Sequence, residues 1–88
     1  MTTNTITVSV RFFARLRESL DTDQLSLDMP AGSSAGQILE ALALRGGNWS
    51  QLIDGAPVML AVNQTMARPT TSLNNHDEVA VFPPVTGG

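Results

Sequence analysis

The sequence contains no cysteine, no lysine and only one histidine among its 88 residues. Without cysteine, the chain cannot form a disulfide scaffold, a cysteine-ligated zinc site, an iron–sulfur cluster or a thiol nucleophile. A single histidine cannot build a multi-histidine metal site, and without lysine two copies cannot be joined through a lysine amine. The glycine-rich motifs that cradle phosphates are missing as well. We therefore expect this chain to bind no metal and no cofactor of its own.

Basic charge is also scarce. Five arginines stand against eight acidic residues, which gives a formal net charge of −3. The arginines are scattered along the chain and form no stripe that could follow a phosphate backbone, so nucleic-acid binding is not expected. Apolar runs are only a few residues long, so no segment is expected to span a membrane. Residues 1–5 lack the basic start of a signal peptide, and we expect a cytoplasmic protein.

What the sequence does contain is the pattern of one small folded domain, in which 42% of the residues are apolar. Polar and apolar residues alternate over residues 5–12. This alternation predicts a strand that buries Ile6, Val8, Val10 and Phe12 on one face. The same reasoning predicts four further strands, at residues 24–29, 58–62, 66–68 and 78–82.

The connections between these strands carry turn and helix signals. The polar residues 21–23 predict a hairpin turn between the first two strands. Ser34 and Gln37 have the spacing of a capping box, which predicts the start of a helix. Gly46 and Gly47 predict its end, because glycine adopts the left-handed conformation that closes many helices. The stripe expected to face the core consists of Ala35, Ile38, Leu39, Leu42 and Arg45.

The rest of the domain offers little chemistry. Residues 48–53 predict a short helical turn in which Trp49 packs back on the core. His76 lies in a polar turn and is expected to be a solvent-exposed turn residue. No pair of carboxylates is placed for general acid–base catalysis, so we expect the chain not to be an enzyme by itself. Packing one helix across one face of a mixed sheet buries these stripes most simply, which indicates an α+β fold.

The last six residues differ from the rest. Pro83 and Pro84 end the last strand, because proline cannot donate a ladder hydrogen bond, and they favour an extended exit. Gly87 and Gly88 lack a Cβ atom, so their backbone can pass through a channel too narrow for a side chain. Joining the terminal carboxylate to AMP would let a sulfur donor displace AMP and leave a nucleophilic thiocarboxylate. The alternative is that the two glycines simply fray at a terminus.

Four segments resemble the family of molybdopterin synthase small subunits. They are residues 77–88 (DEVAVFPPVTGG), 62–65 (VNQT), 10–14 (VRFFA) and 17–18 (RE). The resemblance spans nearly the whole chain in order and length. Its C-terminal motif is highly specific, whereas residues 20–57 are only generically similar.

This resemblance implies a ubiquitin-like β-grasp domain over residues 1–82, with the first and last strands side by side, and an extended tail over residues 83–88. It also implies a sulfur carrier. An adenylyltransferase resembling the ubiquitin-activating enzymes would use ATP to adenylate Gly88, and a sulfur donor system would then install a thiocarboxylate. Gly87, which has no side chain, would let the tail fit into a narrow channel of the partner. The large synthase subunit, in a two-plus-two assembly, would hold the active-site pocket and pass the sulfur to cyclic pyranopterin monophosphate to form the molybdopterin dithiolene.

The phases of the strands add a prediction about the partner. Phe13 and Phe82 fall off the inward phase of their strands, so they would share the outer face of the sheet if these strands are neighbours. Met66 could join them. An exposed aromatic and methionine patch beside the tail fits a docking surface, although a loop could instead cover the rings. The residues expected to contact a partner are Phe13, Met66, Phe82, Pro83, Pro84, Val85 and Thr86.

Two other functions stay open from the sequence. The chain could be a ubiquitin-like modifier that is conjugated to lysines of target proteins through Gly88. It could also be a passive interaction domain in which the final glycines are incidental.

Overall fold

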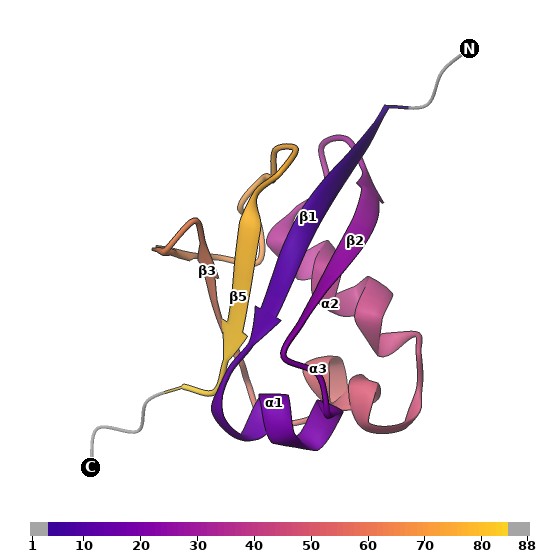
Figure 1. The fold of residues 1–88 in the computed structure, drawn as a ribbon, viewed down its shortest axis with the longest axis vertical. Coiled ribbons are helices and arrows are strands. Elements are labelled where there is room, and N and C mark those ends of the chain that lie inside the picture. The colour runs from indigo at the N-terminus through magenta and orange to yellow at the C-terminus, as the bar shows by residue number, and fades with distance from the viewer. Residues whose placement is uncertain (1–3, 85–88) are drawn as a thin grey trace.

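The computed structural model describes residues 4–84 and contains a five-stranded mixed sheet whose main helix, α2, packs against one face (Figure 1). The strands are β1 (Thr5–Phe12), β2 (Gln24–Pro30), β3 (Met59–Val62), β4 (Thr65–Ala67) and β5 (Glu78–Phe82). The helices are α1 (Ala14–Leu20), α2 (Ala35–Ala43), the 3-10 helix η1 (Gly47–Ser50) and α3 (Gln51–Asp54). The order across the sheet is β2-β1-β5-β3-β4.

The centre of the sheet is formed by β1 and β5, which run parallel, whereas the pairings β1–β2, β3–β4 and β3–β5 are antiparallel. The register places Val10 opposite Val79 and Phe12 opposite Val81, and all four side chains are fully buried. This is the β-grasp arrangement that the sequence predicted, with the first and last strands adjacent. The adjacency matters for function because it carries the end of β5 to the same end of the sheet as Phe12 and Phe13.

The capping box that the sequence predicted opens α2. The Ser34 N–H donates to Gln37 Oε1 at 2.8 Å, and the Gln37 N–H donates to Ser34 Oγ at 3.4 Å. The first bond satisfies a backbone donor at the start of the helix, and the second adds to the bond that the Gln37 N–H makes to Ser34 O at 3.1 Å. Ile38 and Leu42 are completely buried against the sheet, so this helix supplies much of the core.

The prediction that Arg45 lies on the buried stripe is wrong. The helix ends at Ala43, and Gly46 and Gly47 then take positive φ angles of 76° and 57°. Arg45 therefore leaves the helical register and is exposed. Its guanidinium lies 4.8 Å from the ring centroid of Trp49, and that ring packs against the core beside Phe12.

The prediction of a simple hairpin between β1 and β2 is also wrong. Helix α1 lies between these strands and buries Leu16 and Leu20, which are four residues apart on one helix face. Asp21 ends the helix in the left-handed conformation, with a φ of 51°. The two strands nevertheless pair as neighbours. A helix of only two turns has too few apolar positions to give a clear periodic signal beside its arginines.

The hairpin formed by β3 and β4 has a tight turn. β3 and β4 are joined by Asn63 and Gln64, whose φ angles of 51° and 70° match a two-residue turn with left-handed central residues. Asn63 also fixes the neighbouring turn, because its Nδ2 donates to Asp77 Oδ1 and its Oδ1 accepts from the Glu78 N–H, both at 2.9 Å. This part of the segment 62–65 thus has a structural role.

Candidate functional site

The sheet has an outer face, opposite α2, that is apolar over β5, β3 and β4. Residues paired across strands lie on the same face. Ala80 pairs with Ala61, which pairs with Met66, and Phe82 pairs with Met59. Their neighbours in β5 point into the core, so these five side chains form a continuous strip on the outer face.

Phe13 extends this strip toward β1. Its backbone is extended, and its N–H donates to Val81 O at 3.2 Å, so it continues the alternation of β1 and lies beside Phe82. We call Phe13, Met59, Met66 and Phe82 the outer patch. Met66 is 58% exposed, Phe13 38% and Met59 37%, while Phe82 is half-buried. Among residues 4–84 no loop buries Phe13, so its ring is accessible for contact.

The other half of the outer face, over β1 and β2, is polar. For example, Thr7 Oγ1 donates to Asp28 Oδ1 at 2.7 Å across the two strands. Arg11 stands at the border between the two halves. Its guanidinium lies 5.6 Å from the ring centroid of Phe13, and its Nη1 lies 3.5 Å from Glu78 Oε2. The outer patch therefore has one sharp polar edge, which is typical of a docking surface with an apolar centre and a polar rim.

Met59 was missed by the sequence analysis. Residues 58–62 are mostly apolar, so alternation could not assign a face to each side chain. Met59 is assigned to the outer face by its pairing with Phe82, and this pairing could not be predicted from the sequence.

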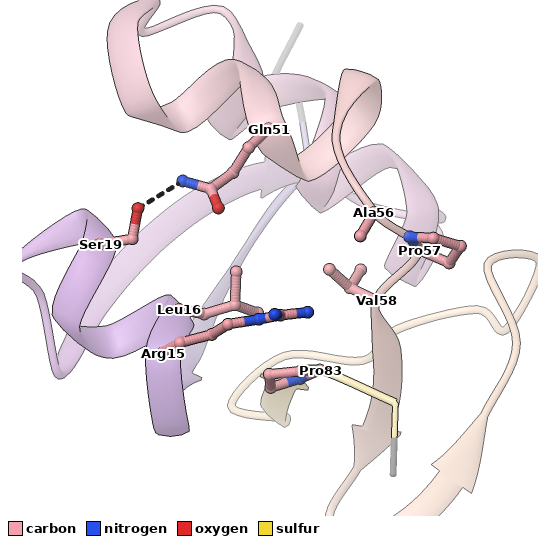
Figure 2. Close-up of a pocket in the computed structure, with 8 residues that line it drawn as sticks. All are labelled: Arg15, Leu16, Ser19, Gln51, Ala56, Pro57, Val58 and Pro83. Atoms are coloured by element: carbon pink, nitrogen blue, oxygen red, sulfur yellow. Dashed lines mark hydrogen bonds between the residues drawn. The ribbon is translucent and has the colours of Figure 1, made fainter. Parts of the chain in front are cut away.

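A pocket of about 280 Å³ lies where the chain leaves β5, and we call it the tail-root pocket (Figure 2). It lies between α1, α3, the segment that leads into β3, and the start of the tail. Its lining residues are Arg15, Leu16, Ser19, Gln51, Ala56, Pro57, Val58 and Pro83. This pocket could not be predicted from the sequence, because four separate segments build it.

The predicted tail residues fall into two groups. Pro83 and Pro84 follow β5 directly and are half-buried. Val85, Thr86, Gly87 and Gly88 lie outside the described residues, so the predicted roles of Gly87 and Gly88 stay predictions. The roles of Phe13, Met66 and Phe82 as partner contacts also stay predictions, although these side chains lie where the strand phases placed them.

Two kinds of feature are not found among the described residues. Within residues 4–84, no three histidine, cysteine, aspartate or glutamate residues gather as metal ligands, and no helix is long and apolar enough to cross a membrane. His76 is exposed in a turn, as predicted, and its backbone N–H donates to Thr7 O at 2.7 Å. What this part of the chain offers is a surface for another macromolecule.

Comparison with known proteins assigns the family. Residues 10–88 match the model of the ThiS family. The "Molybdopterin synthase sulfur carrier subunit" of Haemophilus influenzae is 36% identical over 81 residues, covering 92% of this chain and 99% of the relative. A molybdopterin converting factor, subunit 1, from Pyrococcus furiosus has a similar structure. Its TM-score is 0.76 at 27% identity, over 91% of this chain and 99% of that one.

A second solved structure is also similar. Small archaeal modifier protein 1 of Haloferax volcanii superposes with a TM-score of 0.74 at 25% identity, over 91% of this chain and 99% of the other. The match to the family model, the near-complete cover of the curated relative and the shared fold agree with one another. The chain belongs to the ThiS family, together with the molybdopterin synthase sulfur carrier subunits to which it is similar.

Proposed function

We propose that this protein is the sulfur carrier subunit of a molybdopterin synthase and that its chemistry takes place at Gly88. The observation that carries the proposal is the position of the outer patch. Phe82 ends β5 and is followed at once by Pro83 and the tail, so a partner that grips the patch is held next to the residues that lead to Gly88. Membership in the ThiS family supports this assignment.

The proposed reaction has two charging steps. The carboxylate of Gly88 attacks the α-phosphorus of ATP, which releases pyrophosphate and leaves an acyl adenylate. A sulfide equivalent from a sulfur donor then attacks the acyl carbon, and AMP leaves with the bonding electron pair. The product is a thiocarboxylate on Gly88. An adenylyltransferase resembling the ubiquitin-activating enzymes supplies the ATP site, since this sequence contains no phosphate-binding motif of its own.

Sulfur transfer requires a second protein. The large synthase subunit binds the outer patch and receives the tail, and its pocket holds cyclic pyranopterin monophosphate. The sulfur of the thiocarboxylate attacks a side-chain carbon of the pterin, and a C–O bond at that carbon breaks with its electron pair leaving on the oxygen. Hydrolysis of the resulting thioester leaves the sulfur on the pterin and returns Gly88 to a carboxylate. Two such transfers complete the dithiolene, which fits a two-plus-two assembly. Gly87 provides the clearance that a narrow channel requires.

The intact mass of the protein tests this proposal. Protein taken from cells that make molybdopterin should contain a fraction that is heavier by the difference between one sulfur and one oxygen atom. A variant that lacks Gly88 should contain no such fraction. Complete absence of the sulfur form from wild-type protein, under conditions in which the cells produce molybdopterin, would contradict the proposal.

A second function is favoured by one observation, the structural similarity to small archaeal modifier protein 1. A modifier would be joined through Gly88 to lysines of other proteins. Peptide mapping of cellular proteins distinguishes the two functions, because a modifier leaves isopeptide-linked remnants of this chain on many unrelated targets. A passive interaction domain would show neither modification, and it would keep its function after removal of Gly88.

A further inference from the structure

The tail-root pocket combines an apolar wall with one cation. Leu16, Val58 and Pro83 lie around its interior, and the side chain of Arg15 extends across it between Leu16 and Pro83 (Figure 2). An apolar side chain from another protein would lose contact with water in this space, which is the main source of favourable binding energy at such sites.

The polar groups of the pocket differ in whether they already have partners. Gln51 Nε2 donates to Ser19 Oγ at 2.8 Å and to Asn48 O at 2.7 Å. The amide donors on this side of the pocket therefore already have hydrogen-bond acceptors within the chain. Arg15 has no acidic partner, because the ion pair found within residues 4–84 joins Arg11 to Glu78. Arg15 is also exposed. A carboxylate is the group that its charge and planar donor geometry favour most.

The pocket adjoins the outer patch along the chain. Met59 belongs to the patch and the preceding residue, Val58, lines the pocket. Phe82 belongs to the patch and the following residue, Pro83, lines the pocket. Since Met59 and Phe82 are directly paired, a protein that covers this end of the patch lies next to two of the residues that line the pocket.

We propose that the tail-root pocket is a second docking subsite, which binds an apolar side chain of the large subunit whose neighbouring carboxylate pairs with Arg15. The proposal rests on the proposed function for the identity of the partner. The subsite adds a contact that determines specificity. Of the residues predicted from the sequence to contact a partner, only Pro83 lines this pocket. Because Pro83 forms one wall, occupation of the pocket also fixes the direction in which the tail leaves the sheet.

Isothermal titration of the purified cognate large subunit into the full-length carrier tests the subsite. Arg15→Glu should weaken binding by about tenfold, since it replaces an attraction at the pocket by a repulsion. Arg45→Glu is the matched control, because it makes the same charge change at an exposed arginine beyond the end of α2. The control should bind the large subunit with the Kd of the wild type. Higher salt should reduce the difference in Kd between the two variants, because salt screens the charges.

A second pair of variants tests the apolar part without changing charge. Ala56→Phe places a ring at the exposed edge of the pocket and should weaken binding by occupying it. Ala31→Phe makes the same change at an exposed residue after β2 and should not weaken binding. Thermal unfolding of all four variants should show that each one remains folded at the assay temperature.

The outcomes separate this proposal from the proposed function. If the wild type binds the large subunit, Phe82→Asp weakens binding, and the Arg15 and Ala56 variants bind like the wild type, the subsite is refuted and the sulfur-carrier assignment stands. If the wild type does not bind the large subunit at all, the proposed function fails first. Equal losses for Arg15→Glu and Arg45→Glu would also refute the subsite, because the effect would then be one of net charge.

Discussion

Replacement of Phe82 by aspartate should separate docking from folding. Phe82 lies near the centre of the outer patch, half-buried between Phe13, which follows β1, and its cross-strand partner Met59. An aromatic side chain in such a position typically contributes about 2 kcal/mol or more to binding. Phe82→Asp should therefore raise the Kd for the large subunit by about 30-fold or more.

The effect on folding is smaller. Phe82 faces away from the core, so the substitution removes one cross-strand contact of about 0.2–1 kcal/mol and lowers strand propensity by up to about 1 kcal/mol. The sum, at most about 2 kcal/mol, is well below the stability of about 5–15 kcal/mol that is typical of folded domains. Each kcal/mol lowers the Tm of a domain of this size by about 4–8 °C, so the variant should stay folded near room temperature.

The assay compares calorimetric titration with thermal unfolding followed by circular dichroism. The matched control is Ser26→Asp, which adds the same charge to the polar half of the same sheet face, where Ser26 pairs with Ser9. The control should bind the large subunit like the wild type. An unchanged Kd for Phe82→Asp, or an equal loss in the control, would refute the assignment of the outer patch as the docking surface.

Three further predictions concern the tail and the main helix. Deletion of Gly88 should abolish sulfur transfer in a reconstituted synthase assay and leave the Tm within experimental error, because the core lies within residues 4–84; a large drop in Tm would show that the tail supports the fold. Gly87→Val should block charging or transfer through steric exclusion, whereas Thr86→Val, which keeps the shape of a predicted contact residue and adds no bulk, should have a much smaller effect; normal turnover by the Gly87 variant would rule out the clearance role. Ser34→Ala should lower stability by about 1 kcal/mol through loss of the capping box, with sulfur transfer unchanged below the Tm, and an unaltered unfolding curve would disprove that role.

The sequence predicted the parts of the fold that have strong periodicity. The alternation in β1 and β5 gave both their strand character and the residues that face the core, since each buried residue occupies every second position. The capping box of Ser34 and Gln37 formed as predicted. The β1–β5 pairing came from the resemblance to a known family, because periodicity does not say which strands are neighbours.

The parts that the sequence did not predict depend on contacts between distant segments. Helix α1 is short, and its burial comes from packing against the rest of the fold, so Leu16 and Leu20 alone gave too weak a pattern. Met59 joined the outer patch only through its register with Phe82, and the tail-root pocket formed only where four segments met. Prediction from sequence was therefore strongest for single strands and weakest for surfaces shared among elements.

The most direct test of sulfur carriage is tandem mass spectrometry of the C-terminal peptide during turnover. Carrier that has been charged by its adenylyltransferase, ATP and a sulfur donor is mixed with the large subunit and cyclic pyranopterin monophosphate, and samples are taken as molybdopterin forms. Sulfur should be found on Gly88 at the start and should be replaced by oxygen in step with product formation. Formation of product while Gly88 carries only oxygen throughout, or sulfur located on any other residue, would contradict the account.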